Sequence, residues 1–184
     1  MSYLLKKYKD EVIPAMVKNF GYKSPMAVPK IKKVVVNTGF GRSIVGKSGE
    51  EQKKVQSAVL EDLNLICGQK VILKMAKKSI ASFKIREGQA IGAAVTLRKK
   101  RMYDFLERLI QITLPRSRDF QGISQKGFDK RGNLTIGIKE HIVFSEVLTE
   151  KAKNIFGLEI TITTNAKNKE EGIALLKLMG FPIK

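Results

Sequence analysis

The chain has 184 residues, 43% of them apolar, and its 35 lysines and arginines outnumber its 17 aspartates and glutamates to give a net charge of +18. This length and apolar content fit a folded domain and exclude a disordered basic tail, and the charge points to nucleic acid first and to an anionic membrane surface second. No apolar run approaches the roughly 18 residues of a membrane-spanning helix, and a single cysteine, Cys67, excludes a disulfide framework and favours the reducing cytoplasm.

The first half of the chain alternates helical and extended patterns without a linker. The spacing of apolar residues predicts, in chain order, a helix over 3–20, a strand over 31–38, a helix over 49–67 and a strand over 71–75. Pro14 should kink or interrupt the first helix, because it lacks an N–H donor and its ring clashes with the preceding turn. Gly39 stops the first strand, and Gly68 ends the second helix.

The second half continues this alternation around two basic loops, 76–90 and 114–132. The pattern predicts a strand over 91–98, a helix over 101–113, a strand over 133–139, a short helical piece over 145–155, a strand over 158–164 and a final helix after Asn168. Pro115 is expected to end the helix that precedes it. Asn168 can cap the final helix, and Glu171 completes a capping-box-like pair with it.

The strands over 91–97, 133–139 and 158–164 each carry apolar residues on one face and small or polar residues on the other. In the first of them, the apolar face holds Ile91, Ala93, Val95 and Leu97. The second face is either the ordinary solvated face of an antiparallel sheet or a surface that a sugar-phosphate backbone can approach closely. Because this face lacks aromatic residues for stacking, an RNA on it should be folded or duplexed and read by shape.

The segment 77–101 is the most informative part of the chain. A basic loop containing Gly88 runs into an alternating strand, which ends in four consecutive cations, Arg98 to Arg101. The N-terminus of the helix that follows carries a partial positive charge, so cations there are unfavourable unless a polyanion compensates them. A solvated charge run is the alternative, but the net charge of the whole chain favours the polyanion.

Catalytic chemistry finds little support in the sequence. His141 is the only histidine, and no cysteine stands at metal-ligand spacing from it. The segment Gly46-Lys47-Ser48 matches only the end of a phosphate-binding loop motif. A nucleic-acid enzyme and a DNA-compacting architectural protein would share the positive charge. Turnover of RNA would identify the enzyme, and binding of duplex DNA as tightly as folded RNA would identify the architectural protein.

Nine strings with a common family pattern extend over nearly the whole chain. They are Tyr8 to Val12, Val28 to Ile31, Val36 to Gly39, Gly68 to Lys70, Ala76 to Gly88, Val95 to Arg98, Leu114 to Phe120, Phe128 to Asn133 and Leu158 to Thr164. In these strings the chain resembles the bacterial ribosomal protein L5 family, the 5S-rRNA-binding proteins of the large subunit. It departs at 140–146, where Glu-His-Ile-Val-Phe-Ser-Glu stands in place of the expected Glu-Gln-Ile-Ile-Phe-Pro-Glu.

The resemblance implies an α+β fold over a single RNA-binding domain, 1–184, with helices on one side of a mainly antiparallel sheet in an RRM-like arrangement. It implies binding to 5S rRNA and adjacent 23S rRNA in the central protuberance, beside neighbouring large-subunit proteins. It also implies that the loop matching Lys77 to Gln89 reaches the peptidyl-site tRNA, and that another edge bridges to a protein of the small-subunit head. A protein of this kind is not an enzyme, needs no coenzyme or metal, has no membrane partner and works in the cytoplasmic ribosome.

Two groups of site residues follow. Polar groups at strand ends beside cations can fix the register of an RNA backbone, and the residues expected to contact rRNA are Asn37, Thr38, Gln69, Lys70, Thr96 and Arg98. By resemblance, the residues expected to contact tRNA are Lys77, Lys78, Ser79, Lys84 and Arg86. Repulsion among its cations should keep their loop extended and mobile. Its apolar residues, Ile80, Phe83 and Ile85, could instead pin the base of the loop to the core.

The long segment 114–132 is a third candidate, because irregular loops of this length are usually functional or disordered. Its cations are Arg116, Arg118, Lys126, Lys130 and Arg131. We expect Arg116 and Arg118 to lie on an edge that contacts rRNA or a small-subunit protein, as the resemblance implies. The alternative is that Phe120 and Phe128 simply attach the segment to the core.

Overall fold

The computed structural model describes residues 2–118, 120–147 and 154–184. The chain forms two compact units. Unit 1 consists of Met1–Val35, Leu97–Ile136 and Ile160–Lys184, and unit 2 consists of Val36–Thr96 and Gly137–Glu159. The expectation of a single domain over 1–184 therefore stays a prediction, and each unit is described by itself.

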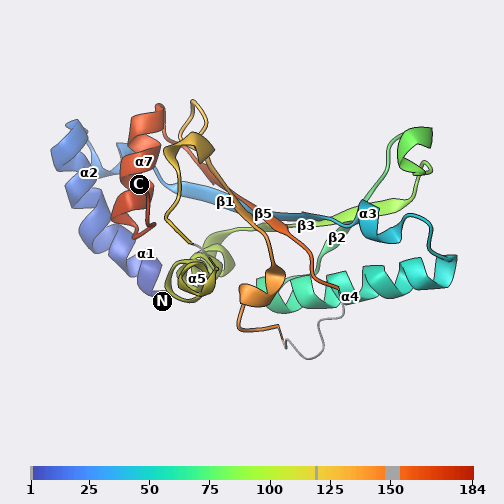
Figure 1. Cartoon of the computed structure of the whole chain (residues 1–184). Helices are drawn as coiled ribbons and strands as arrows, with labels where there is room; N and C mark the ends of the chain where they lie inside the picture. Colours follow the sequence, from blue (N-terminus) through green and yellow to red (C-terminus); the bar gives the residue numbers. More distant parts are fainter. Residues whose placement is uncertain (1, 119, 148–153) are drawn as a thin grey trace. The chain divides into compact units, whose positions relative to one another are not determined.

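Five strands form one sheet in the order β2-β3-β1-β5-β4 (Figure 1). Their bounds are Ile31–Gly39 for β1, Ile72–Met75 for β2, Ala90–Leu97 for β3, Leu134–Ile138 for β4 and Leu158–Thr164 for β5. All five agree with the strands predicted from the alternation of apolar residues to within one or two residues. The sheet is antiparallel with helices on one side, so the predicted α+β fold is confirmed.

The two faces of the strands differ in burial as the alternation predicts. In β4 and β5, the buried positions are Leu134, Ile136, Ile138, Leu158, Ile160, Ile162 and Thr164. Strand β3 departs from the prediction, because Ile91 is only half-buried whereas Gly92 is buried. The register between β2 and β3 shifts at Lys74/Met75, where Met75 pairs with Ala90 and leaves Ile91 without an opposite residue. Such a bulge turns a side chain out of the strict alternation.

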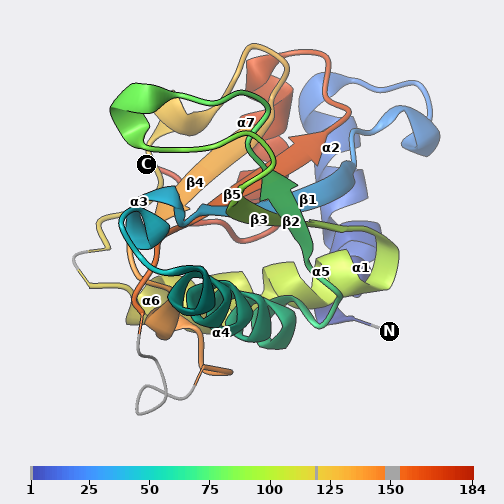
Figure 2. The same cartoon turned by 90° about the vertical axis from the view of Figure 1, so that its right-hand side faces the viewer.

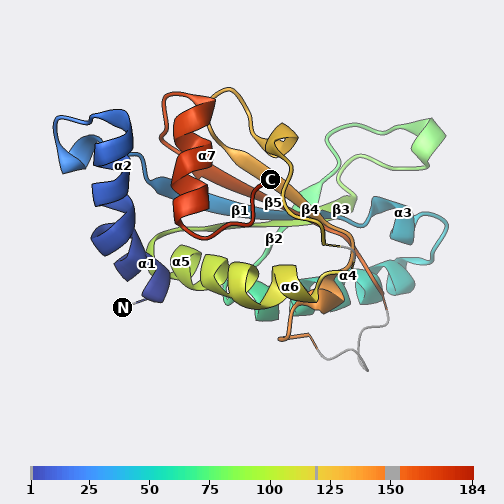
Figure 3. The same ribbon diagram turned by 60° about the vertical axis from the view of Figure 1, so that its left-hand side comes forward.

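Unit 1 contains two long helical runs, each with a π-helical stretch before a proline (Figure 3). The first run consists of α1 Tyr3–Lys7, the π-helix η1 Tyr8–Val12 and α2 Ile13–Phe20, and the second of α5 Lys99–Arg108, the π-helix η4 Leu109–Thr113 and α6 Leu114–Arg116. Pro14 and Pro115 lie at the start of α2 and α6. The wider π turn accommodates the missing N–H donor of each proline without ending the helix.

The second run differs from its prediction at both ends. The helix begins at Lys99, two residues before the predicted Arg101, and Pro115 lies inside its last turn instead of ending it. The final helix of unit 1, α7 Lys169–Leu178, has Asn168 at the N-cap position, as predicted, but the Asn168 side chain makes no capping hydrogen bond. The Glu171 carboxylate instead accepts from the backbone N–H of Lys167 at 3.0 Å, one residue before the cap.

Helix α4 Gly49–Cys67 of unit 2 has the bounds that its sequence predicts and lies beside β2 and β3 (Figure 2). Ser48 and Glu51 cap each other's backbone N–H at its start, a capping box that fixes this end. Gly68 ends it with a left-handed φ of 61°, a conformation that glycine adopts without strain. Ser48 of the weak Gly46-Lys47-Ser48 match is thus a helix cap.

The remaining elements are short. They are α3 Gly41–Ile44 and the 3-10 turns η2 Pro25–Ala27, η3 Ala81–Phe83, η5 Gln125–Gly127 and η6 His141–Val143. The helical piece predicted over 145–155 falls partly on residues 148–153, which lie outside the described residues. No helix in the described part of the chain has both the length and the apolar composition needed to cross a bilayer.

Candidate nucleic-acid interface

Asn37 and Thr38, at the end of β1 in unit 2, point to opposite faces of their strand. Asn37 is half-buried on the open face, and its Nδ2 donates to Oε2 of Glu159 at 3.3 Å. Thr38 is only 2% exposed, and its hydroxyl donates to the carbonyl oxygen of Gly157 at 2.7 Å. The geometry therefore leaves Asn37 partly accessible on the open face beside Glu159, whereas the buried Thr38 hydroxyl holds the strand end in place.

Gln69 and Thr96 are brought together by a hydrogen bond. The Nε2 atom of Gln69, just after α4, donates to the carbonyl oxygen of Thr96 near the end of β3 at 3.1 Å. Both Thr96 and Lys70, the neighbour of Gln69, are exposed. Two predicted contact residues that are far apart in the sequence thus lie side by side in unit 2, with a cation next to them.

Gly92 lets β3 approach β1 more closely than any other residue could. A Cβ atom built on Gly92 would lie 2.8 Å from the carbonyl oxygen of Thr38, which is backbone and cannot move aside cheaply. Sequence reasoning placed Gly92 on the small-residue face and missed this role. A glycine inside a strand is the signal that could have indicated it, because strand glycines often mark a close backbone approach.

Arg98 belongs to unit 1 and is the N-cap residue of α5. Its side chain makes no capping hydrogen bond, and the first turn of the helix contains no acidic residue. Lys99 has a positive φ of 51°, an uncommon conformation for a residue with a side chain. The predicted collection of cations at a helix N-terminus is confirmed, and Arg98, Lys99 and Lys100 are all exposed.

The loop 76–90 of unit 2 folds back on itself as a closed finger (Figure 1). At its base, the N–H of Ala76 donates to the carbonyl oxygen of Gln89 at 2.8 Å. Near its tip, Ile80 and Ile85 exchange backbone hydrogen bonds of 3.0 and 3.2 Å, and Lys84 turns the chain with a left-handed φ of 50°. Charge repulsion predicts an extended loop, and the backbone pairing shows what opposes that repulsion.

The side chains of this finger fall into two sets. The predicted cations Lys77, Lys78, Lys84 and Arg86 are all exposed. Ser79 has a structural task, because its hydroxyl accepts from the N–H of Glu87 at 2.9 Å and joins the two arms. The suggestion that apolar residues pin the finger to the core is wrong for Ile80 and Phe83, which are 44% and 63% exposed.

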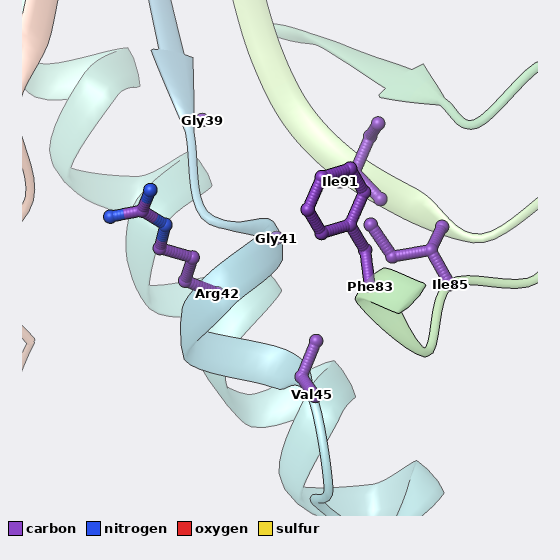
Figure 4. A pocket seen from close by; sticks show the side chains of 7 residues that line it. All are labelled: Gly39, Gly41, Arg42, Val45, Phe83, Ile85 and Ile91. Carbon is purple, nitrogen blue, oxygen red and sulfur yellow. The ribbon is translucent and has the colours of Figure 1, made fainter. Parts of the chain in front are cut away.

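A pocket lies where the finger meets the end of β1 (Figure 4). Its volume is about 700 Å³, and its lining consists of Gly39, Gly41, Arg42, Val45, Phe83, Ile85 and Ile91. In Figure 4 the side chains of Phe83, Ile85 and Ile91 gather on one side of the glycine backbone, and Arg42 lies on the other. The sequence patterns gave no indication of this pocket, because its residues come from three separate stretches, 39–45, 83–85 and Ile91.

The segment 114–132 of unit 1 is attached to its own unit at several points. Phe128 is 6% exposed and Ile123 is 6% exposed, and Ile123 pairs with Ile183 near the C-terminus. The alternative prediction, that this segment is attached to the core, is therefore confirmed for Phe128. Phe120 is only half-buried. Arg116 and Arg118 are exposed and remain available to a partner.

His141 lacks the surroundings of a catalytic residue. It is fully buried, stacks on Phe156 with ring centroids 3.9 Å apart, and faces the Asp62 carboxylate. Burial lowers the pKa of His141, an effect that the charge of Asp62 opposes. Among the described residues, no group of three or more histidine, cysteine, aspartate or glutamate side chains could hold a metal ion.

Comparison with known proteins gives matches over nearly the whole chain. A family model described as ribosomal protein L5 matches residues 24–86, and one described as the ribosomal L5P family C-terminus matches residues 90–183. The chain is 51% identical over 182 residues to the large ribosomal subunit protein uL5 of Halothermothrix orenii, covering 99% of this chain and 98% of that protein. It is 49% identical over 184 residues to the uL5 of Geotalea daltonii, covering 100% and 99%.

Proposed function

The chain belongs to the ribosomal protein L5 family, and from that membership we propose that it binds 5S rRNA and the adjacent 23S rRNA in the central protuberance of the large subunit. It is a structural protein of the large ribosomal subunit, and the family is not enzymatic. RNA binding and a part in translation follow from the membership of this family. The chain acts in the cytoplasmic ribosome. Its other partners are neighbouring large-subunit proteins.

The contact between Gln69 and Thr96 is the observation that carries the proposal of rRNA binding. It fixes two polar groups beside Lys70 on unit 2, where Asn37 also presents its amide. Fixed polar groups set the register of an RNA backbone, and neighbouring cations supply affinity. In this proposal Thr38 acts indirectly, by holding the end of β1, and Arg98 adds charge at the start of α5.

We further propose that the finger 76–90 contacts the peptidyl-site tRNA. Its exposed cations Lys77, Lys78, Lys84 and Arg86 suit phosphate contacts, which carry no sequence information and therefore serve every tRNA alike. Ser79 supports the finger by joining its arms. Arg116 and Arg118 belong in this proposal to an edge that bridges to a protein of the small-subunit head.

Competition between two polyanions tests the central proposal. Labelled 5S rRNA is bound to the full chain at a fixed salt concentration, and unlabelled 5S rRNA or duplex DNA of equal length is added. The proposal expects the RNA to compete far more strongly than the DNA, since charge alone would make the two equal. Equal competition would identify a nonspecific polyanion binder and contradict the proposal.

A further inference from the structure

An exposed phenylalanine beside an apolar pocket is the feature of unit 2 that the contacts proposed so far leave unexplained. Phe83 is 63% exposed, although it lines the pocket together with Ile85 and Ile91. A volume of about 700 Å³ falls within the roughly 300–1,000 Å³ of small-ligand sites. The pocket is therefore large enough to enclose part of a partner.

Phe83 is not needed to hold the finger together. Backbone hydrogen bonds close the finger at Ala76 and Gln89 and again at Ile80 and Ile85. At the base, Nε2 of Gln89 also donates to Oε1 of Gln52 on α4 at 3.2 Å. With the loop closed by polar contacts, the exposed ring is left free to meet a ligand.

The charges around the pocket select the kind of ligand. Arg42 lines the pocket, and Lys84 and Arg86 flank Phe83 and Ile85 along the chain, all three of them exposed. No acidic residue is among those that line the pocket. An apolar ring surrounded by cations matches a nucleotide, which combines a flat base with a negative phosphate, and aromatic rings in RNA-binding proteins stack on such bases.

The pocket is also continuous with the proposed rRNA surface. Gly39, on its wall, directly follows Asn37 and Thr38 on β1. A Cβ atom built on Gly39 would have nothing within 4 Å, so open space lies above the backbone there. A ligand backbone can therefore pass over Gly39, between Phe83 on one side and Arg42 on the other (Figure 4).

We propose that this pocket receives one unstacked nucleotide of the 5S rRNA. Its base stacks on Phe83 against Ile85 and Ile91, and the adjoining phosphates run over Gly39 towards Arg42. This inference rests on the proposed binding of 5S rRNA and adds a base-stacking site to a surface otherwise built for phosphate contacts. In this proposal Phe83, on the finger next to the sheet, supplies the aromatic contact that the face of the sheet lacks.

A tryptophan reporter tests the stacking. The chain contains no tryptophan, so Phe83→Trp introduces a single one in the full-length protein. Binding of 5S rRNA should quench its fluorescence, because a base stacks on the indole ring. Phe20→Trp is the matched control: Phe20 is 37% exposed, lies in unit 1 and lines no part of this pocket. Its fluorescence should change little.

Two further variants make the result decisive. Gly39→Val fills the open space without backbone strain, and in the Phe83→Trp background it should remove the quenching while leaving detectable 5S rRNA binding. Phe83→Ala should weaken 5S rRNA binding by about 5- to 100-fold, the loss expected for one base–aromatic stack.

The outcomes separate this inference from the function on which it rests. If no variant and not even the native chain binds 5S rRNA, the proposed function fails. Normal binding of 5S rRNA without quenching of the Phe83→Trp fluorescence would show that no base stacks in this pocket. Quenching that persists in Gly39→Val would show the same, and in both cases the proposed function stands. Quenching by tRNA but not by 5S rRNA would also overturn the assignment, because the pocket would then belong to the tRNA surface of the finger.

Discussion

His141 holds its Nε2 atom 3.3 Å from Oδ2 of Asp62 on α4, while its Nδ1 accepts the backbone N–H of Phe156 at 3.4 Å. The accepting Nδ1 requires the neutral ring to carry its hydrogen on Nε2, facing the carboxylate. The attraction between Nε2 and the Asp62 carboxylate is electrostatic, because Nε2 makes no well-aligned hydrogen bond. The contact ties the segment around η6 to α4 within unit 2.

The first prediction is that the burial of His141 makes stability depend on pH. Burial lowers the pKa of His141 below its unfolded value of about 6.5. The unfolded chain therefore binds a proton on the His141 ring more readily than the folded chain does. The contribution of His141 to the free energy of unfolding is complete above about pH 6.5 and is lost as pH falls. Between pH 6.5 and 5.5, the native chain should lose more of its unfolding free energy than His141→Gln does. Urea denaturation at each pH checks this.

Asp62 acts on the pH dependence of stability in the opposite direction. Burial raises the pKa of Asp62, and the charge of His141 counters that rise. The folded chain therefore binds the Asp62 proton more readily than the unfolded chain does, so this group offsets part of the loss from His141 as pH falls. Identical pH profiles for the native chain and His141→Gln would show that His141 does not contribute.

The second prediction concerns the cation at the start of α5. Arg98→Ala should weaken 5S rRNA binding and reduce the slope of log affinity against log salt by about one, the effect of losing one phosphate contact. Binding measured over a range of salt concentrations provides both values. Lys177→Ala, which removes an exposed cation from the end of α7, should leave the slope unchanged. An equal effect of the two substitutions would show that Arg98 contributes only net charge.

The third prediction separates the cations of the finger from the 5S rRNA anchor, to which the finger contributes only the pocket at Phe83. Changing Lys77, Lys78, Lys84 and Arg86 together to alanine should largely spare 5S rRNA binding and ribosome assembly, because Phe83 and Arg42 of the pocket remain, but it should weaken retention of peptidyl-site tRNA. The backbone pairing of the finger does not depend on these side chains, so the finger should keep its shape. Filter binding of tRNA to assembled ribosomes measures the effect. Failure of the quadruple variant to bind isolated 5S rRNA would place these four cations in the anchor instead.

The fourth prediction concerns the edge that carries Arg116 and Arg118. Replacing both by alanine should weaken the joining of the two ribosomal subunits, because both side chains are exposed and the proposed bridge depends on them. The fold should be unaffected, since buried Phe128 and Ile123 hold the segment independently. Sedimentation of mixed subunits at several magnesium concentrations gives the measurement. Normal joining with an intact fold would reject the bridging role.

The fifth prediction concerns the close approach of two strands. Gly92→Ala should destabilise the protein by about 1–3 kcal/mol, the usual cost of an overpacked site, because its Cβ would lie 2.8 Å from the Thr38 carbonyl oxygen. Gly137→Ala in β4 is the control, since a Cβ there would meet nothing within 4 Å. Thermal unfolding of the two variants compares them. Equal stability would mean that the strands can separate at little cost.

The sequence predicted the elements well wherever local signals agreed. Helix α4 matches its prediction because apolar spacing and Gly68 indicate its bounds, and the structure adds a Ser48 cap at the same start. The strands of the sheet were found because one face is apolar and the other is not. One proline was misjudged: Pro115 was expected to end a helix, but a π-helical stretch keeps it inside one. No local propensity signals that adjustment.

The candidate site was harder to predict from the sequence than the fold, because it depends on contacts between residues that are far apart in the chain. Asn37 and Thr38 are equivalent as strand-end polar residues, and only the fold shows that one faces outward and the other bonds to Gly157. The hydrogen bond from Gln69 to Thr96 joins residues 27 positions apart. The pocket at Phe83 has no sequence signature, because the bulge at β3 turns Ile91 towards it against the simple alternation.

The π-helical stretch η1 also sets the phase of the first helical run. Its buried side chains Leu4, Tyr8, Val12 and Met16 follow one another at intervals of four residues, whereas in a regular α-helix each such step would drift by about 40° around the axis. The wider turn of η1 cancels part of that drift and keeps the row in line. If residues 8–12 formed a regular α-helix without any change in their number, Leu4 and Met16 would lie about 120° apart around the axis, so that the two side chains could no longer face the same core.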